Sequence, residues 1–228
     1  MANAKEIQER MSSINDTLKI TNAMYMISSS KLKKSKKMLQ DTEPYFYELQ
    51  SQMSRILRHV PDIKSKYFEK TRTEKKEPKV GYIVITADKG LAGSYNHNIL
   101  KIAEEQIKTH KDNKLFVLGE VGRHYFEKRG LHIDKLDEIH IIYTKMVNPI
   151  KEEAEIKQLL PLYKTDFEMK VPADIPLEQV TFRPSPEEVM NKIVPAYIEG
   201  FVYGALVESY SCEQNARMMA MEGATNSA

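Results

Sequence analysis

Residues 7–60 read IQERMSSINDTLKITNAMYMISSSKLKKSKKMLQDTEPYFYELQSQMSRILRHV, and an apolar side chain recurs in them every three or four positions. The apolar set is Ile7, Met11, Ile14, Leu18, Tyr25, Leu32, Leu39, Phe46, Leu49, Met53, Ile56 and Val60, and Thr21, Ser28, Ser35 and Thr42 interrupt it. A mean repeat of about 3.5 residues keeps one stripe of a helix turned toward a partner in a left-handed coiled coil. Such a helix is roughly 80 Å long, whereas a globule of this chain length is about 45 Å across. The helix must therefore project from the rest of the molecule.

Local signals bound this first helix at residues 1–60. Pro61 ends the apolar pattern, and Pro44 predicts a bend inside it, because proline cannot donate the helical backbone hydrogen bond. The next stretch, 61–79, holds ten charged residues between 64 and 79 and few apolar ones. This composition predicts a solvated, charged connection and marks the first domain boundary.

Short β-branched runs alternate with helical stretches across residues 80–182. The runs are VGYIVIT at 80–86, LFVLG at 115–119 and IHIIYT at 139–144. Strands that alternate with helices predict an α/β domain with a mainly parallel sheet.

One passage of this domain conflicts with a parallel sheet. Only five residues, DKLDE, separate a predicted strand at 131–133 from the next one. Parallel strands, however, need a connection of about a dozen residues or more. Either the sheet turns antiparallel at this point or residues are absent near 133–136. We favour the second alternative and therefore expect the domain to be incomplete there.

Residues 187–228 predict a second long helix. Its broad apolar face comprises Val189, Ile193, Val194, Tyr197, Ile198, Phe201, Val202, Ala205 and Leu206. Its end is rich in alanine and methionine, which lets a partner backbone approach closely. We predict that it returns along the first helix in an antiparallel coiled coil. Since 42 residues face 54, about a dozen N-terminal residues lack a partner, and we expect the second helix to be truncated.

The formal charge of +2 identifies no partner for the whole chain, but the basic residues are concentrated in 17–40. That stretch contains no acid, and its lysines are Lys19, Lys31, Lys33, Lys34, Lys36 and Lys37. It is either a solvated helix face or a surface that binds phosphates, acidic lipids or an acidic protein loop.

Other sequence features indicate the compartment. The single cysteine, Cys212, excludes an intrachain disulfide and fits a reducing environment. No apolar run approaches the ~18 residues needed to span a bilayer. The N-terminus has no apolar signal stretch, and its acids, Glu6, Glu9 and Asp16, argue against a transit peptide. We therefore expect the chain to act in a cytoplasm.

The stretch TADKGLAGSYN, residues 86–96, follows a predicted strand and opens a helix, where backbone N–H groups can hold phosphate. It lacks the spacing of a P-loop and the third glycine of a dinucleotide fingerprint, so we interpret it as a structural turn capped by Asp88 and Asn96. The histidines form no i, i+4 pair, and one cysteine cannot complete a zinc site. No serine or cysteine lies in a nucleophile elbow. The sequence therefore predicts no metal, no cofactor and no catalytic residue.

Four segments together resemble the γ subunit of rotary F-type ATP synthases. They are KEIQERMSSINDTLKITNAMYMISSSKLKKS at 5–35, TADKGLAGSYN at 86–96, DEIHIIYTKMVN at 137–148 and EQNARMMAMEGATNSA at 213–228. The paired motifs K-I-T-x-A-M and A-R-M-x-A-M carry the resemblance at the two ends. It implies an antiparallel coiled coil of the terminal helices with a Rossmann-like α/β foot domain. Members of that family have a further segment where this sequence has 133–136, and their last helix continues.

The resemblance also implies a function without chemistry in this chain. The γ subunit is the central rotor inside a ring of three α and three β chains, and its foot lies with the ε subunit on the membrane c-ring. Rotation of the ion-driven c-ring is thereby coupled to ATP synthesis or hydrolysis. The implied location is peripheral, at the cytoplasmic face of a bacterial membrane, with no nucleic acid bound and membrane contact only through the complex.

Residue roles transfer by motif position. The positions at which the family rotor meets the acidic levers of the β subunits, or which lie beside them, are Met24, Lys31, Lys33, Lys34, Glu213 and Arg217. Phe182 matches a position in the foot that faces the c-ring.

Two other functions are alternatives. A coiled-coil adaptor would bind nucleic acid or an anionic membrane through its lysine face, with strong salt dependence. A small nucleotide-binding enzyme would use the glycine turn at 90–93 and bind nucleotide without partners. Neither alternative explains a helix of this length as directly.

Overall fold

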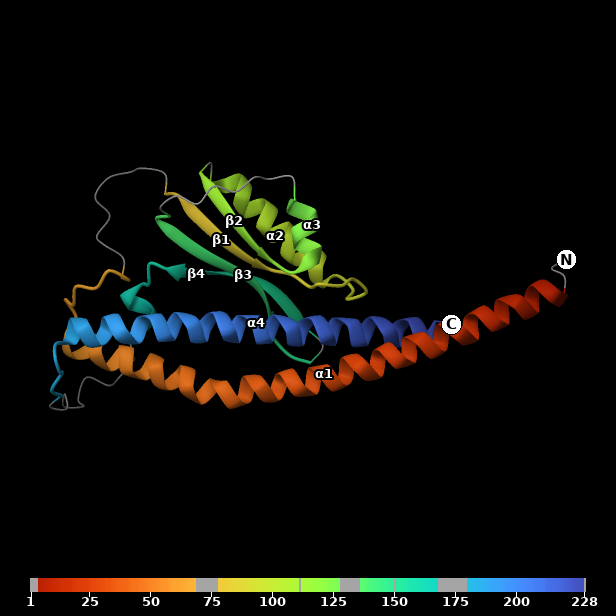
Figure 1. Ribbon diagram of the computed structural model, residues 1–228, viewed down its shortest axis with the longest axis horizontal. Helices are drawn as coiled ribbons and strands as arrows, with labels where there is room; N and C mark the ends of the chain where they lie inside the picture. Colours follow the sequence, from red (N-terminus) through yellow and green to blue (C-terminus); the bar gives the residue numbers. More distant parts are fainter. Residues whose placement is uncertain are drawn as a thin grey trace.

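The computed structural model describes residues 4–68, 78–110, 112–127, 136–149, 151–167 and 180–227. Two long helices, α1 (Ala4–His59) and α4 (Pro186–Asn226), run antiparallel along the molecule, and a four-stranded sheet with its own helices lies against α4 (Figure 1). The predicted fold class, an antiparallel coiled coil with an α/β domain, is confirmed.

The sheet has the strand order β2-β1-β3-β4. Its strands are β1 (Val80–Ile85), β2 (Asn113–Leu118), β3 (Glu138–Met146) and β4 (Glu152–Leu160), and the helices of the domain are α2 (Tyr95–Thr109) and α3 (Glu120–Phe126). Strand β1 pairs in parallel with both β2 and β3, whereas β4 pairs antiparallel with β3. The sheet therefore turns antiparallel at β4, which follows β3. It does not turn at the short DKLDE passage before β3, where the sequence conflicted with a parallel sheet. The strand predicted at 131–133 lies outside the described residues.

Successive side chains of each strand point to opposite faces of the sheet, and both faces are buried. On one face, Tyr82, Val84 and Ile142 pack with α2 around a cluster that also takes in Cys212 and Ala216 of α4. On the other face, Ile85, Ile141 and Tyr143 pack against Ala205 and its neighbours in α4. Helix α4 is thus part of the core of the α/β domain and also one of the two helices of the coiled coil.

Strand β4 was not expected from its composition. Its sequence, EEAEIKQLL, mixes acids and lysine with few β-branched residues. It lies at the edge of the sheet, where one side of the strand has no partner in the sheet order and charged residues discourage pairing with other chains. Pairing with β3 therefore produces a strand that local propensity does not predict.

The contact between α1 and α4 includes the positions that interrupt the apolar pattern. Thr21, Ser28 and Ser35 are buried. Thr21 Oγ1 lies 2.8 Å from Thr225 Oγ1, and Ser211 Oγ donates to Ser35 Oγ at 2.8 Å. The two bonded pairs are 14 residues apart on each helix, as expected for heptads in an antiparallel pair.

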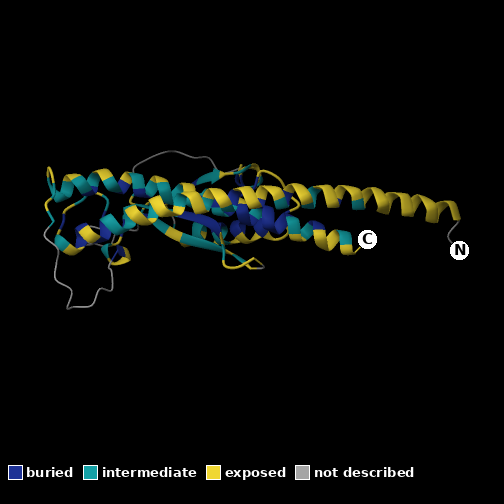
Figure 2. Cartoon of the chain, turned by 90° about the horizontal axis from the view of Figure 1, so that it is seen from below, coloured by how far each residue is buried: buried dark blue, intermediate teal, exposed yellow. Residues whose placement is uncertain are grey.

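Helix α1 extends beyond the C-terminal end of α4, and its first turns are exposed (Figures 1 and 2). Ile7, Met11 and Ile14 are 49%, 60% and 41% exposed, so the pattern that begins there has no partner within the described residues. The unequal helix lengths predicted this projection. Pro44 lies inside α1, which continues to His59 and is curved along its length.

Candidate functional site

The lysine face of α1 is open to solvent. Lys31, Lys33 and Lys34 are exposed, and none has an ion-pair partner within the described residues. Lys19, in contrast, pairs with Asp16 at 3.0 Å. A shallow groove beside this face is lined by four lysines and one acid, together with uncharged residues: Lys33, Lys34, Lys36, Lys37 and Asp41, with Tyr25, Ser29, Ser30, Leu32, Gln40 and Met218. A cationic face of this kind suits an acidic surface.

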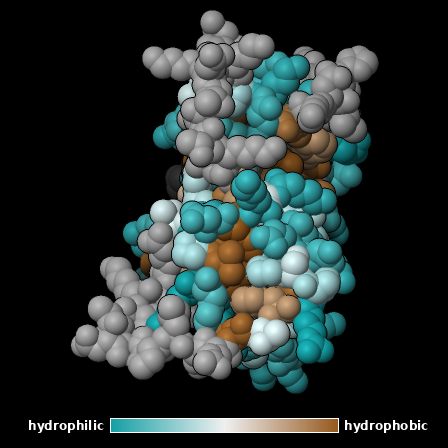
Figure 3. All heavy atoms as spheres, turned by 90° about the vertical axis from the view of Figure 1, so that its left-hand side faces the viewer, coloured by the Kyte–Doolittle hydropathy of each residue, from teal (hydrophilic) through white to brown (hydrophobic). Residues whose placement is uncertain are grey.

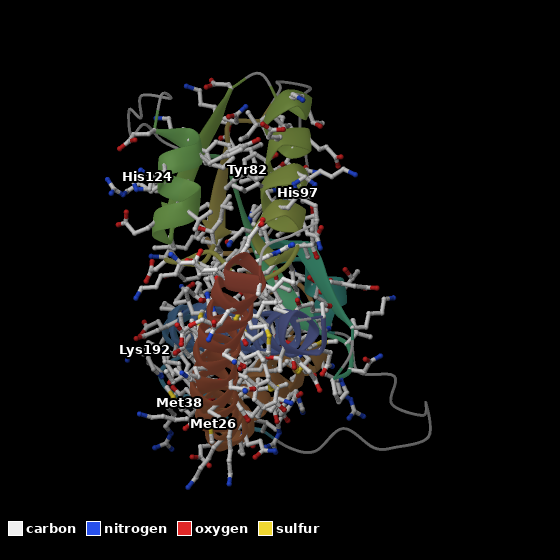
Figure 4. All side chains as sticks on the ribbon, turned by 90° about the vertical axis from the view of Figure 1, so that its right-hand side faces the viewer. Met26, Met38, Tyr82, His97, His124 and Lys192 are labelled. Carbon is white, nitrogen blue, oxygen red and sulfur yellow. The ribbon has the colours of Figure 1, made fainter. Side chains whose placement is uncertain are left out.

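Met24 lies on the same helix, one turn from the buried Thr21, and is partly buried. Met26 and Met38 are 71% and 39% exposed and lie on the side of α1 that faces away from the α/β domain (Figure 4). Two methionine side chains are therefore open to a partner. The sequence motifs predicted a contact at Met24 but not at Met26 or Met38.

Arg217 is buried, with 8% of its surface exposed. Its Nη2 donates to the backbone carbonyls of Gly90 at 3.1 Å and Lys89 at 3.2 Å, and to Glu213 Oε1 at 2.7 Å. Its Nε also donates to Gly90 O, at 3.4 Å. The structure therefore brings Glu213 and Arg217 together, but aims both inward at a turn of the same chain. Met24 and the three lysines lie on the other helix.

The turn at 86–96 has the geometry of a structural turn. Asn96 Oδ1 accepts the N–H of Ala87 at 2.9 Å, as a cap. Asp88 Oδ1 accepts from Glu120 N at 3.2 Å, so Asp88 caps the start of α3 instead of its own turn. Because the carbonyls of Lys89 and Gly90 point at Arg217, this part of the turn presents acceptors where phosphate binding requires donors.

We use the term base end for the end of the molecule at which α1 ends and α4 begins. Phe182 lies there, half-buried, with its ring centroid 6.3 Å from that of His59 in an edge-on contact. It packs on a cluster that includes Met53, Ile56 and Met190. Figure 3 looks onto this end and shows apolar atoms gathered in its middle with polar atoms around them.

Polar side chains of α4 bond to the backbone of β3 in the middle of the molecule. Ser209 Oγ accepts from Thr144 N at 3.1 Å, and Glu208 Oε1 accepts from Met146 N at 3.2 Å. Burial raises the pKa of Glu208, although its bond to Met146 opposes the shift. Sequence reasoning missed these residues. The available signal was the polar run ESYSCEQN inside an otherwise apolar helix.

Burial also raises the pKa of two groups near this junction. The thiol of Cys212 is fully buried and its pKa is raised, so it is a poor nucleophile. The pKa of Glu152, at the start of β4, is raised to about 7. Its Oε2 atom is buried without a hydrogen-bond partner among the residues that the structure describes.

The described residues contain no cluster of metal-ligating side chains. His97 and His124 lie on different helices and point away from each other (Figure 4). Among the helices that the structure describes, none is both long and apolar enough to cross a membrane.

A long antiparallel helix pair, carried by an α/β domain and bearing an open cationic face, defines a shaft-like subunit of a larger assembly. The ATP synthase family model matches residues 3–135 and 131–228, which together span nearly the whole sequence. Curated relatives at up to 43% identity over the full chain are ATP synthase γ chains, so the chain belongs to the ATP synthase γ chain family. It is a central-stalk subunit and not itself an enzyme, and the adaptor alternative has no support.

Curated relatives match this chain over nearly its full length, and their names agree with the family assignment. The ATP synthase γ chain of Acetivibrio thermocellus is 43% identical over 262 residues, covering 100% of this chain and 88% of the relative. The sodium-ion-specific ATP synthase γ chain of Acetobacterium woodii is 32% identical, covering 99% and 88%. A chain of the central stalk and c-ring of the Tetrahymena thermophila mitochondrial ATP synthase has the same fold. Its TM-score is 0.62 at 22% identity over 90% of this chain and 99% of that one.

The comparisons give two observations on the segment that we expect to be absent near 133–136. The alignment with the Acetivibrio chain has 262 positions for the 228 residues of this chain, a difference of 34. The two family matches meet at residues 131–135. The overlap of the family matches supports this position, whereas the alignment length gives no position, and the expectation remains a prediction because residues 128–135 lie outside those described.

Proposed function

We propose that this chain rotates inside a hexamer of α and β subunits and couples their nucleotide sites to a membrane c-ring. The observation that carries the proposal is the open lysine face on a helix that projects beyond its partner. An acid-free stretch at 17–40 keeps that face cationic. An acidic lever of a β subunit is the partner that such a surface fits.

Lys31, Lys33 and Lys34 are proposed to make the direct contacts with the β subunits. Met24 lies partly buried on the same helix and is proposed to lie within the contact zone. Glu213 and Arg217 contribute differently, because they already bond to each other and to the turn at 89–90. We propose that they set the shape of the surface next to the contact.

The base end is proposed to face the c-ring, with Phe182 near the contact, and the α/β domain is proposed to carry the ε subunit. The apolar centre of that end, ringed by polar atoms, supports a protein contact there. The chain would then lie at the cytoplasmic face of a bacterial membrane, bound through the complex.

Coupling follows from the asymmetry of the shaft. One cationic face can meet only one of three equivalent acidic levers closely at any rotor angle. Each angle therefore favours a different conformation in each β subunit, and rotation shifts nucleotide affinity among the three sites.

Lysine replacement in the assembled complex tests this proposal. We expect Lys33→Gln with Lys34→Gln to lower ion pumping per ATP hydrolysed in reconstituted vesicles while the complex still assembles. The matched control is Lys101→Gln with Lys108→Gln, two exposed lysines on α2. Equal pumping ratios in the two double variants would contradict the assignment of the lysine face. Native mass spectrometry through a tag on this chain should show one copy with three each of two larger chains.

A further inference from the structure

Two side chains of α4 hold two different loops of the α/β domain. Arg217 donates to the carbonyls of Lys89 and Gly90, in the loop from β1 to α2. Asn215 Nδ2 donates to the carbonyl of Pro149 at 3.2 Å, in the loop from β3 to β4. Both side chains are buried, with 3% of Asn215 and 8% of Arg217 exposed.

Helix geometry places these contacts on opposite sides of α4. Successive residues are rotated by about 100° around a helix axis, so Asn215 and Arg217 point about 100° to either side of Ala216. Ala216 itself is buried in the cluster that joins α4 to α2 and the sheet. The α/β domain therefore packs over Ala216, and one of its loops is bonded to α4 on each flank.

This arrangement resists one motion in particular. Ser209 and Glu208 bond to the backbone of β3 along the middle of α4 and fix the domain lengthwise. Bonds on both flanks oppose rotation of the domain around α4, since rotation in either direction stretches one of them. Arg217 is suited to this, because its planar guanidinium makes several bonds and Glu213 holds it in place.

We propose that Asn215 and Arg217 are positioning residues that lock the α/β domain against rotation about the shaft. Torque applied to the domain then passes into α4 at this level of the shaft. The proposal rests on the rotor function proposed above. It assigns Arg217 a task inside the subunit, distinct from that of the exposed lysines, which face a partner.

Hydrogen exchange in the assembled complex, measured with ion pumping per ATP, tests the lock. Arg217→Met is combined with Glu213→Gln, so that no buried carboxylate is left without its cation. We expect the amides of residues 88–93 to exchange about tenfold faster, as for loss of a charge-assisted hydrogen bond. Asn215→Ala should have a smaller effect, confined to the loop at 147–149. Both variants should pump fewer ions per ATP in complexes that assemble normally.

Arg217→Lys separates the lock from a simple charge effect. It keeps the positive charge but loses the planar fork, so the lock predicts faster exchange at 88–93 and weaker coupling here too. Wild-type exchange and wild-type coupling in Arg217→Lys would overturn the proposal. So would faster exchange spread over all of α1 and α4, which would indicate a general loss of stability.

The lysine double variant distinguishes this proposal from the rotor proposal. Lys33→Gln with Lys34→Gln should weaken coupling and leave exchange at 88–93 unchanged. If neither the lysine variant nor the Arg217 variants change coupling, the rotor contacts are wrong. If only the Arg217 variants leave both exchange and coupling unchanged, the lock alone is wrong.

Discussion

The helix pair has two halves that are held together by different interactions. Near the base end, Met53 and Ile56 of α1 pack with Met190 and Val194 of α4 in one apolar cluster. Beyond the middle, apolar side chains such as Leu32 and Met221 alternate with small and hydroxyl-bearing ones, which form the bonds Ser35–Ser211 and Thr21–Thr225. The apolar half gains stability from burial, whereas the hydroxyl half gains register from directional bonds and less stability.

This difference suits a shaft with a fixed base and a compliant end. In the apolar half, the ring of Phe46 stacks on Tyr197 with centroids 5.1 Å apart, and Tyr197 also meets Phe167 edge-on. At the middle of α4, where the two halves meet, Gly204 has open space where a side chain would begin. We infer that twisting is easier in the hydroxyl half, which also carries the lysine face.

The largest effect is expected from a cavity in the apolar half. Met53 and Met190 are fully buried. We predict that Met53→Ala lowers the free energy of unfolding by about 2–5 kcal/mol, through lost burial and an unfilled cavity. Chemical denaturation of the purified chain measures this. Met26→Ala, at a position that is 71% exposed, is the control and should change little. A similar small loss for both variants would contradict the claim that the two halves differ.

A pH-dependent effect is expected where the hydroxyl half meets the sheet. Burial raises the pKa of Glu152 from its ordinary 4.5 to about 7 in the folded chain. The folded state therefore binds the proton more tightly than the unfolded state. The contribution of this group to stability is fully present below about pH 4.5 and is lost as pH rises through about 7.

Glu152→Gln should remove this part of the pH dependence. We expect the wild-type chain to lose stability relative to the variant between about pH 5 and pH 8, as measured by unfolding midpoints. Glu153→Gln, at an exposed neighbour, is the matched control. A constant difference between wild type and Glu152→Gln across this range would show that Glu152 titrates normally.

A smaller effect is expected from the hydrogen bond between the helices. A double-mutant cycle on Ser35→Ala and Ser211→Ala should give a coupling energy of about 0.5–1.5 kcal/mol. Ser211 Oγ also lies 2.9 Å from Val207 O, so its single proton can turn to that acceptor when Ser35 is removed, and this limits the loss. The control cycle pairs Ser28→Ala with Ser211→Ala, which share no bond in the described structure. Equal coupling energies in the two cycles would mean that the hydroxyl half has no specific pairing.

The sequence predicted the helices better than their contacts. Heptad spacing is a local property, so the two long helices and their antiparallel pairing could be predicted. The role of Ser28 and Ser35 could not, because a serine interrupts an apolar pattern unless the facing helix brings a small or hydroxyl residue to it. Arg217 shows the same limit: its acceptors lie 127 and 128 positions earlier in the chain. A motif position indicated that Arg217 matters, but not what it touches.

The smallest effect is expected from a substitution at the middle of α4, where the two halves meet. Gly204 lies inside α4, and a Cβ added there meets no atom within 4 Å, so Gly204→Ala creates no clash. Because alanine favours the helix, we predict a gain of about 0.5–1 kcal/mol in the free energy of unfolding. Gly119→Ala is the contrasting variant, since φ is +100° there and the new Cβ would lie 2.2 Å from the carbonyl oxygen of Thr86. It should destabilise the chain.

If Gly204→Ala stabilises the isolated chain but slows rotation in the assembled complex, the open space at Gly204 serves compliance. If it stabilises the chain and rotation is unchanged, the twist of the shaft lies elsewhere, and the contrast between the two halves concerns stability alone.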